Sequence, residues 1–352
     1  MKTTVAKANG FTLIETLIAT LVAVIILGAA VLVFKSTSDV NRVGQLRADM
    51  QQDARGALAI INRDLSQAAT GMPPAGIPVP RRAVFACGPT QCYLGGIGYP
   101  NNILSSVVPD GAIGANGTDA ITIAYVDATW PVNAKDLVAI APNGGTITVN
   151  QGTFDPNGNP AGPPAGRDYR DPVVGTQVGD VLLLQNNNGP AVVTVTGVAG
   201  GGVLTLAPAD PLLLNTPGAA ALANKDKSFP AKTGALRINI VTYFVSIFPP
   251  PPAVGGVPVL MRQVSAHTAV PVAEYAQTLQ FTYDIFDPTI GPTGTYTSAL
   301  PANAVNDSSQ IRKVSMSLTL RSAYPDPQGV YRTLTVNSAV APRDLSFSDR
   351  YQ

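Results

Sequence analysis

Glu15 is the first side chain whose type and position could do chemistry, because it lies near the start of a long apolar run. From Phe11 to Phe34 there are 24 residues, and Glu15 is the one ionisable side chain among them. A carboxylate deep in a membrane helix costs about 2.5–3.5 kcal/mol on insertion scales. It could lie one turn inside the bilayer and reach back to the headgroups. Alternatively, cleavage after Gly10 would give it a cationic partner, the α-amino group of Phe11, in the same chain or a neighbouring one.

Two cysteines form the second candidate site. Cys87 and Cys92 enclose the sequence GPTQ, in which Pro89 favours the bend that a small disulfide loop needs. If this part of the chain is exported, it enters an oxidising compartment where a disulfide is stable. We therefore expect a disulfide, with two free thiols as the alternative. We expect no zinc site, because two cysteines without a nearby histidine do not complete a zinc ligand shell.

Signs of catalysis are weak. His267, the only histidine, lies in SAHTA, and no GxSxG, P-loop or HExxH pattern accompanies it. A lone histidine in a polar loop is most simply a surface residue. The segment DPNGN at 155–159 begins like a calcium loop, but Pro160 and Gly166 replace the required glycine and carboxylate. We predict no enzymatic activity, no catalytic residue, no metal site and no cofactor.

The element that must position Glu15 is a membrane-spanning helix. At about 1.5 Å per residue the run from Phe11 to Phe34 is roughly 36 Å long, enough to cross a hydrocarbon core of about 30 Å. A secretory signal peptide has a shorter apolar region and a small-residue cleavage site, which GAAVLVFKS fits poorly. Lys2 and Lys7 precede the helix, so the positive-inside rule places that end in the cytoplasm. The residues beyond Phe34 are then extracytoplasmic.

These residues carry a resemblance to a known family. A basic leader ending in Gly10, then Phe11-Thr12-Leu13-Ile14-Glu15 and a long apolar stretch, resembles the processing signature of type IV prepilins and of type II secretion pseudopilins. The resemblance implies that a prepilin peptidase cuts after Gly10 and that Phe11 is N-methylated. It also implies that Glu15 supports subunit assembly.

Composition supports an exported, turn-rich domain after the helix. Charged residues make up 13% of the 352-residue chain, against about 25% in average proteins, while the apolar fraction is 45%. The 33 glycines and 31 prolines indicate many turns. The formal net charge of +1 argues against a strong electrostatic nucleic-acid surface. The apolar fraction is too high for a disordered tail.

The chain changes character at Pro73, the first proline. Before it, an apolar stripe with steps of three and four predicts that the helix continues to about Ala69, with two helices broken near Ser36–Ser38 as the alternative. After it, we predict strands at 119–126, 145–150, 178–185, 190–198, 201–207, 236–248, 257–264, 279–286, 311–322 and 331–340, and a Gly/Pro-rich loop at 151–172.

The predicted fold class is therefore α+β, with a long N-terminal helix packed on an antiparallel β-rich C-terminal domain. The helix has a membrane-spanning half and an amphipathic half. The expected division is a leader at 1–10, a transmembrane helix at 11–34, its amphipathic continuation at 35–72 and an extracytoplasmic head at 73–352.

The C-terminal part extends the resemblance. RDLSQA at the end of the helix, followed by VTYFVS, VLMRQV, VAEYAQTLQFTYD and IRKVSMSLTLRS, resembles PilW-type minor pilins. It implies a minor pilin of the inner membrane that enters a type IV pilus and takes part in priming its assembly. The implied partners are prepilin peptidase, major and minor pilins, and membrane lipid. Two alternatives stay open: a minor pseudopilin of the J type in type II secretion, and a single-span anchored binding domain.

The cleavage signature gives a direct test. Replacing Gly10 with valine places a bulky side chain at the cut, so Gly10→Val should leave the precursor at full length in the membrane. A blot of membrane fractions distinguishes the precursor from the processed form. Normal processing of this variant would contradict the predicted site.

Overall fold

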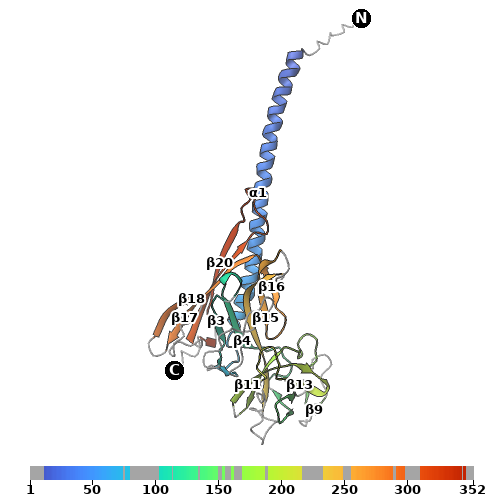
Figure 1. Ribbon diagram of the computed structural model, residues 1–352, viewed down its shortest axis with the longest axis vertical. Helices are drawn as coiled ribbons and strands as arrows, with labels where there is room; N and C mark the ends of the chain where they lie inside the picture. Colours follow the sequence, from blue (N-terminus) through green and yellow to red (C-terminus); the bar gives the residue numbers. More distant parts are fainter. Residues whose placement is uncertain are drawn as a thin grey trace, which may run out of the picture. The chain divides into compact units, whose positions relative to one another are not determined.

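The protein has an α+β fold in which one long helix precedes a set of antiparallel sheets (Figure 1). The computed structural model describes residues 12–73, 76–79, 103–112, 114–133, 135–149, 153–154, 160–161, 169–186, 189–215, 233–248, 255–287, 291–297, 310–342 and 344–345. The chain divides into two compact units. One contains Met1–Gln51 and Ser322–Arg332, and the other contains Gln52–Arg321 and Thr333–Gln352.

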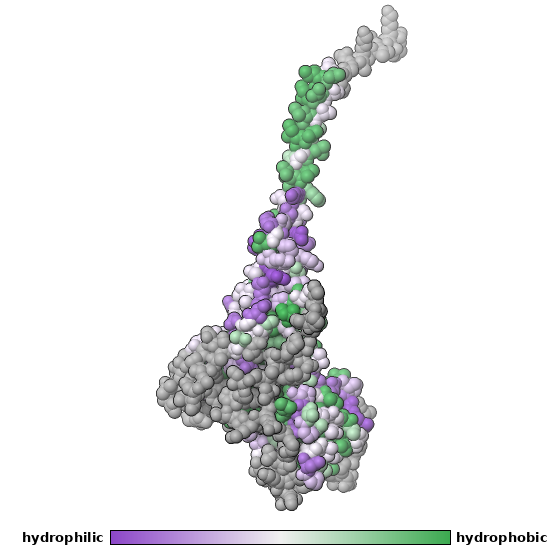
Figure 2. All heavy atoms as spheres, in the orientation of Figure 1, coloured by the Kyte–Doolittle hydropathy of each residue, from purple (hydrophilic) through white to green (hydrophobic). Residues whose placement is uncertain are grey.

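The helix α1 (Leu13–Gln67) is unbroken over 55 residues, so the alternative of a break at Ser36–Ser38 is not observed. It ends where Ala69 and Gly71 adopt left-handed backbone angles, with φ of 72° and 69°, just before Pro73. Its first half is apolar on the face seen in Figure 2. By length and composition α1 is able to cross a membrane. A signal sequence near an N-terminus meets the same two criteria.

The strands after α1 are mostly short, and every described pairing is antiparallel. They are β1 (Ile77–Pro78), β2 (Ile103–Leu104), β3 (Val107–Asp110), β4 (Ala120–Val126), β5 (Lys135–Asp136), β6 (Ala139–Ile140), β7 (Thr146–Thr148), β8 (Thr153–Phe154), β9 (Pro160–Ala161), β10 (Val181–Asn186), β11 (Gly189–Thr194), β12 (Gly197–Val198), β13 (Val203–Thr205), β14 (Gly234–Phe248), β15 (Val257–Val264), β16 (Val270–Glu274), β17 (Ala276–Asp287), β18 (Gly291–Thr297), β19 (Ile311–Arg321) and β20 (Thr333–Val340).

Each predicted strand range overlaps an observed strand, while β1, β2, β3, β5, β6, β16 and β18 lie outside those ranges. Prolines at 109, 271 and 292 fall within β3, β16 and β18 and weakened their sequence signal. The predicted loop at 151–172 contains the paired strands β8 and β9.

Among the described strands, β14 is the centre of the largest sheet, which has eight strands. Along one edge it pairs with β4, from Ile238 to Tyr243. Along the other edge, Gly234 to Ile238 of β14 pair with β10, and Val241 to Phe248 pair with β15. This change of partner leaves a short stretch of β14 around Ile240 between two neighbouring strands. The candidate site described below is built beside that stretch.

A second sheet has the order β18-β17-β19-β20. Buried and partly exposed side chains alternate along β19, and exposed and partly exposed ones alternate along β20. Alternation of this kind is expected when one face of an antiparallel sheet covers the core. A smaller sheet, β12-β13-β7-β6, covers a separate apolar cluster that includes Trp130, Leu182 and Leu204.

The main core forms where the last turns of α1 meet both large sheets. Ala54, Ala57, Ile61, Leu65 and Ala68 of the predicted stripe are fully buried there. Their partners include Ile123 of β4, Val241 and Tyr243 of β14, and Phe281 and Leu318 of the second sheet. Burying an Ile or Leu side chain contributes about 1.5–3 kcal/mol. The small alanines leave room for the helix backbone to approach the sheets closely.

Asp64 lies on this buried face with no exposed surface. Its carboxylate accepts hydrogen bonds from the Tyr243 hydroxyl at 2.6 Å, Arg262 Nε at 2.8 Å and the Tyr125 hydroxyl at 3.3 Å. Burial and the negative charge of Asp64 raise the pKa of Tyr125 to about 12. Burial lowers the pKa of Arg262, but pairing with Asp64 outweighs it and raises that pKa overall. Burial and Asp64 also raise the pKa of Tyr243, so both tyrosines stay neutral and Arg262 stays charged at neutral pH.

The Asp64 network should stabilise the fold measurably. Asp64→Ala leaves Arg262 without its buried carboxylate, so we expect a loss of about 3–5 kcal/mol in the free energy of unfolding. Tyr125→Phe removes one hydrogen-bond donor and should cost about 1 kcal/mol. Denaturant unfolding followed by Trp130 fluorescence measures both. The control is Asp53→Ala, an exposed aspartate on the same helix, and equal effects at positions 53 and 64 would contradict the role of the network.

Candidate functional site

The helix-start site, made of Thr12 and Glu15, is a reciprocal cap at the beginning of α1. Thr12 N and Thr12 Oγ1 each donate a hydrogen bond to Glu15 Oε2 at 2.9 Å. In return, Glu15 N donates to Thr12 Oγ1 at 3.3 Å. This is a capping box, in which the first and fourth residues of T-x-x-E satisfy each other's backbone N–H groups. Gly10 and Phe11, the predicted cleavage and methylation positions, lie outside the described residues.

The capping box gives Glu15 a local structural role beyond the two predicted ones, and the T-x-x-E pattern of Thr12-Leu13-Ile14-Glu15 is its signal in the sequence. The carboxylate is held by its own chain, which lowers the cost of placing it in apolar surroundings. All its hydrogen bonds from described residues reach Oε2, so they leave Oε1 without a donor. A cation approaching the start of the helix would therefore meet an oriented carboxylate whose Oε1 can accept a further hydrogen bond.

The predicted disulfide cannot be placed, because Cys87 and Cys92 lie outside the described residues, as do 155–159. Asp171 is described, and its Oδ1 accepts hydrogen bonds from the backbone N–H groups of Val173 and Val174 at 2.8 and 3.1 Å. Its carboxylate thus organises a turn. Within the described part of the chain, no group of three His, Cys, Asp or Glu residues is arranged to hold a metal ion.

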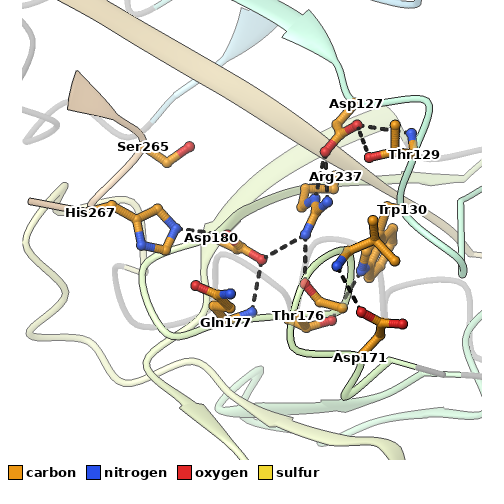
Figure 3. Close-up of polar contacts among 12 residues, drawn as sticks. Asp127, Thr129, Trp130, Asp171, Thr176, Gln177, Asp180, Arg237, Ser265 and His267 are labelled. Carbon is orange, nitrogen blue, oxygen red and sulfur yellow. Dashed lines mark hydrogen bonds and ion pairs between the residues drawn. The ribbon is translucent and has the colours of Figure 1, made fainter. Parts of the chain in front are cut away.

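A polar cluster joins Asp127, Asp180, Arg237 and His267 beside β14 (Figure 3). Arg237 Nε and Nη2 donate to Asp127 Oδ2 at 3.0 and 2.6 Å. Arg237 Nη1 reaches Asp180 Oδ2 at 3.3 Å, and His267 Nε2 lies 2.8 Å from Asp180 Oδ1. The imidazole is 30% exposed, so His267 is not the plain surface residue that the sequence suggested. Asp180 therefore links the arginine to the histidine.

Local backbone geometry explains why these groups meet. Gly179, just before Asp180, has φ of +101°, and a Cβ there would lie 3.3 Å from the His267 ring. Glycine therefore permits both the left-handed backbone and the close approach of the imidazole. Gly179 O also accepts a hydrogen bond from Ala266 N at 3.0 Å. The turn before β10 is thereby joined to the turn after β15.

Ser265, His267 and Asp180 have the residue types of a hydrolytic triad but not its geometry. Ser265 Oγ accepts a hydrogen bond from Ile240 N at 3.4 Å and lies 3.5 Å from Ile238 O, to which it donates. The hydroxyl thus lies against β14 and makes no hydrogen bond to the imidazole (Figure 3). A triad requires the nucleophile to bond to its base. The described geometry supports a structural role, in which Ser265 fills the gap between β10 and β15.

The comparisons with known proteins returned no match. No protein-family model matches the chain, and neither a curated protein nor a solved structure is significantly similar to it.

The Asp127–Arg237 pair makes part of the stability depend on pH. Burial raises the pKa of Asp127, but hydrogen bonds from Thr129 and Arg237 outweigh it and hold the pKa below the ordinary value. A depressed folded-state pKa gives stability that is complete above the unfolded pKa of about 3.9 and lost as the pH falls through the folded pKa.

We therefore expect Asp127→Asn to lower the free energy of unfolding at pH 7 by about 2 kcal/mol, because it removes charge-assisted hydrogen bonds. The difference from the unmodified protein should shrink steadily below pH 4. Denaturant unfolding of both proteins across the acid range measures it. A difference that stays constant down to pH 2 would show that Asp127 does not contribute through its charge.

Proposed function

We propose that this protein is a membrane-anchored subunit of a filament of the type IV pilin class. More narrowly, we propose a minor pilin-like subunit that is cut by prepilin peptidase and takes part in priming pilus assembly. The observation that carries the proposal is the sequence Gly10-Phe11-Thr12-Leu13-Ile14-Glu15 at the start of a single helix that runs to Gln67. One element thus joins the processing signature to the β-rich region.

The burial pattern of α1 supports this proposal. In the first half the large apolar side chains are exposed, from Leu13 at 81% to Phe34 at 76%. Water is a poor solvent for such a surface, so it requires lipid or the helices of other chains. In the second half the apolar stripe is buried in the β-rich region. A helix with these two halves suits a subunit that is stored in a membrane and then packs its first half against neighbours.

The helix-start site suggests how assembly is favoured. Cleavage after Gly10 creates a positive α-amino group on Phe11, and methylation keeps the charge. Glu15 Oε2 stays occupied by Thr12, while Oε1 is available to the amine of a neighbouring chain. In a low-dielectric environment an ion pair of this kind is much stronger than in water. The capping box would then serve to orient the carboxylate for its partner.

Glu15 could favour assembly through its charge or through its capping of the helix, and two substitutions distinguish these roles. Glu15→Leu removes both, whereas Glu15→Gln keeps a side chain that can complete a capping box. Both variants should be cleaved and should remain in the membrane. If the charge drives assembly, both should be depleted from sheared filaments relative to the unmodified protein at equal expression.

The measurement is the amount of processed protein in membrane and sheared-filament fractions, together with mass spectrometry of the mature N-terminus. We expect that N-terminus to be methylated Phe11. Filament incorporation of Glu15→Gln but not of Glu15→Leu would assign the effect to capping. Incorporation of both at the unmodified level would contradict the ion-pair mechanism. A chain that still begins at Met1 in the membrane would contradict the pilin-class proposal itself.

A further inference from the structure

The loop between β19 and β20, residues Ser322–Arg332, is an ordered platform held by its own polar groups. Asp326 Oδ1 accepts hydrogen bonds from the backbone N–H groups of Gln328 and Val330, each at 2.9 Å. Asp326 Oδ2 accepts from Arg332 Nε at 2.7 Å. At the base of the loop, Ser322 N donates to Arg332 O at 2.7 Å and Arg332 N donates to Ser322 Oγ at 3.0 Å. These contacts fix the loop without an apolar core of its own.

This ordered loop presents apolar side chains to its surroundings. Tyr324 is 65% exposed, Val330 is 54% exposed and Tyr331 is 45% exposed. The only charged residues of the loop, Asp326 and Arg332, are paired with each other, and the Asp326 side chain is fully buried. The largest exposed side chains of the loop are therefore aromatic and aliphatic, beside Gln328 and the partly exposed Arg332, and the loop's own residues carry no net charge. Such a surface favours a partner that offers apolar contact to the aromatic rings and hydrogen bonds to the tyrosine hydroxyls.

The loop belongs to the same compact unit as residues 1–51. In Figure 1 it lies beside α1 near the middle of the helix, where the apolar first half gives way to the amphipathic second half. For a helix that crosses a bilayer, this level corresponds to the membrane–water interface. Tyrosine is enriched at that interface, because its ring sits among headgroups and upper acyl chains while its hydroxyl stays hydrated.

We propose that Tyr324, Val330 and Tyr331 rest on the outer leaflet of the bilayer that α1 crosses, so that the β19–β20 loop is a second, interfacial contact with lipid. This inference rests on the membrane insertion of α1 but not on filament assembly. The alternative occupant is a second copy of the chain. Lipid is favoured because the loop belongs to the same compact unit as the first half of α1. The exposed apolar side chains of that half also need an apolar environment such as lipid.

Depth-dependent fluorescence quenching tests the proposal on the full chain reconstituted in phosphatidylcholine vesicles. Trp130, the only native tryptophan, is 2% exposed and gives a constant background. Single added tryptophans replace Tyr324, or Tyr331 as an independent second site. Leu21→Trp marks the membrane-spanning helix, and Val173→Trp marks an 82% exposed apolar position in the β-rich region. The vesicles carry lipids brominated near either the carbonyl or the methyl end of the acyl chains.

We expect the tryptophans at 324 and 331 to show blue-shifted emission and to lose intensity with the shallow bromines, but not with the deep ones. Leu21→Trp should respond most to the deep bromines, and Val173→Trp should report only general adsorption. Quenching at 324 and 331 no greater than at 173, with position 21 quenched, would overturn the loop contact and leave the membrane helix standing. A blue shift that grows with protein-to-lipid ratio without quenching would assign the loop to a second copy. Absence of quenching at position 21 would overturn both proposals.

Discussion

The burial of one face of α1 is the constraint on which the β-rich region depends. Ala54, Ala57, Ile61 and Leu65 lie against both large sheets, so the helix completes a core that neither sheet could close alone. The same face carries Asp64, whose carboxylate is compatible with this core only because two tyrosines and Arg262 bind it. A buried carboxylate with specific partners tolerates little change in the position of the helix. Its contacts with Tyr243 and Arg262 therefore fix the position of α1 against β14 and β15.

Glu15 and Asp64 show two solutions to the same physical problem, an acidic group on a helix surface that is otherwise apolar. Near the start of α1 the unsatisfied backbone donors are close at hand, so Glu15 is satisfied locally by Thr12. Deep in the helix no backbone donor is available, because each N–H already bonds to a carbonyl one turn earlier. Asp64 must then draw its donors from strands distant in sequence. Among the described residues, the local solution uses one oxygen of the Glu15 carboxylate, whereas the tertiary solution uses both oxygens of Asp64.

The cluster around Arg237 shows how polar groups can order a junction between strands. Strand β14 changes partner from β10 to β15 along one edge, which interrupts the ladder near Ile240. Ser265 supplies the missing hydrogen bonds to β14, and Gly179 lets His267 approach Asp180. The residue types in this cluster resemble those of a catalytic site, but each polar atom is directed at a neighbouring strand or turn. Its described contacts fit a structural role in the β-rich region.

The sequence alone determined the parts that depend on near neighbours. An uninterrupted apolar run and its stripe predicted α1 almost to its last residue, and β-branched segments predicted the main strands, because periodicity reflects local burial. Thr12 and Glu15 are three residues apart, so the T-x-x-E pattern of their capping box is also visible in the sequence, although the box itself was not predicted. Only the tertiary structure decided which distant polar groups meet: Tyr243 and Arg262 are 179 and 198 positions from Asp64. Such contacts are set by strand order and register, which result from packing the whole chain and leave no periodic signal in the sequence.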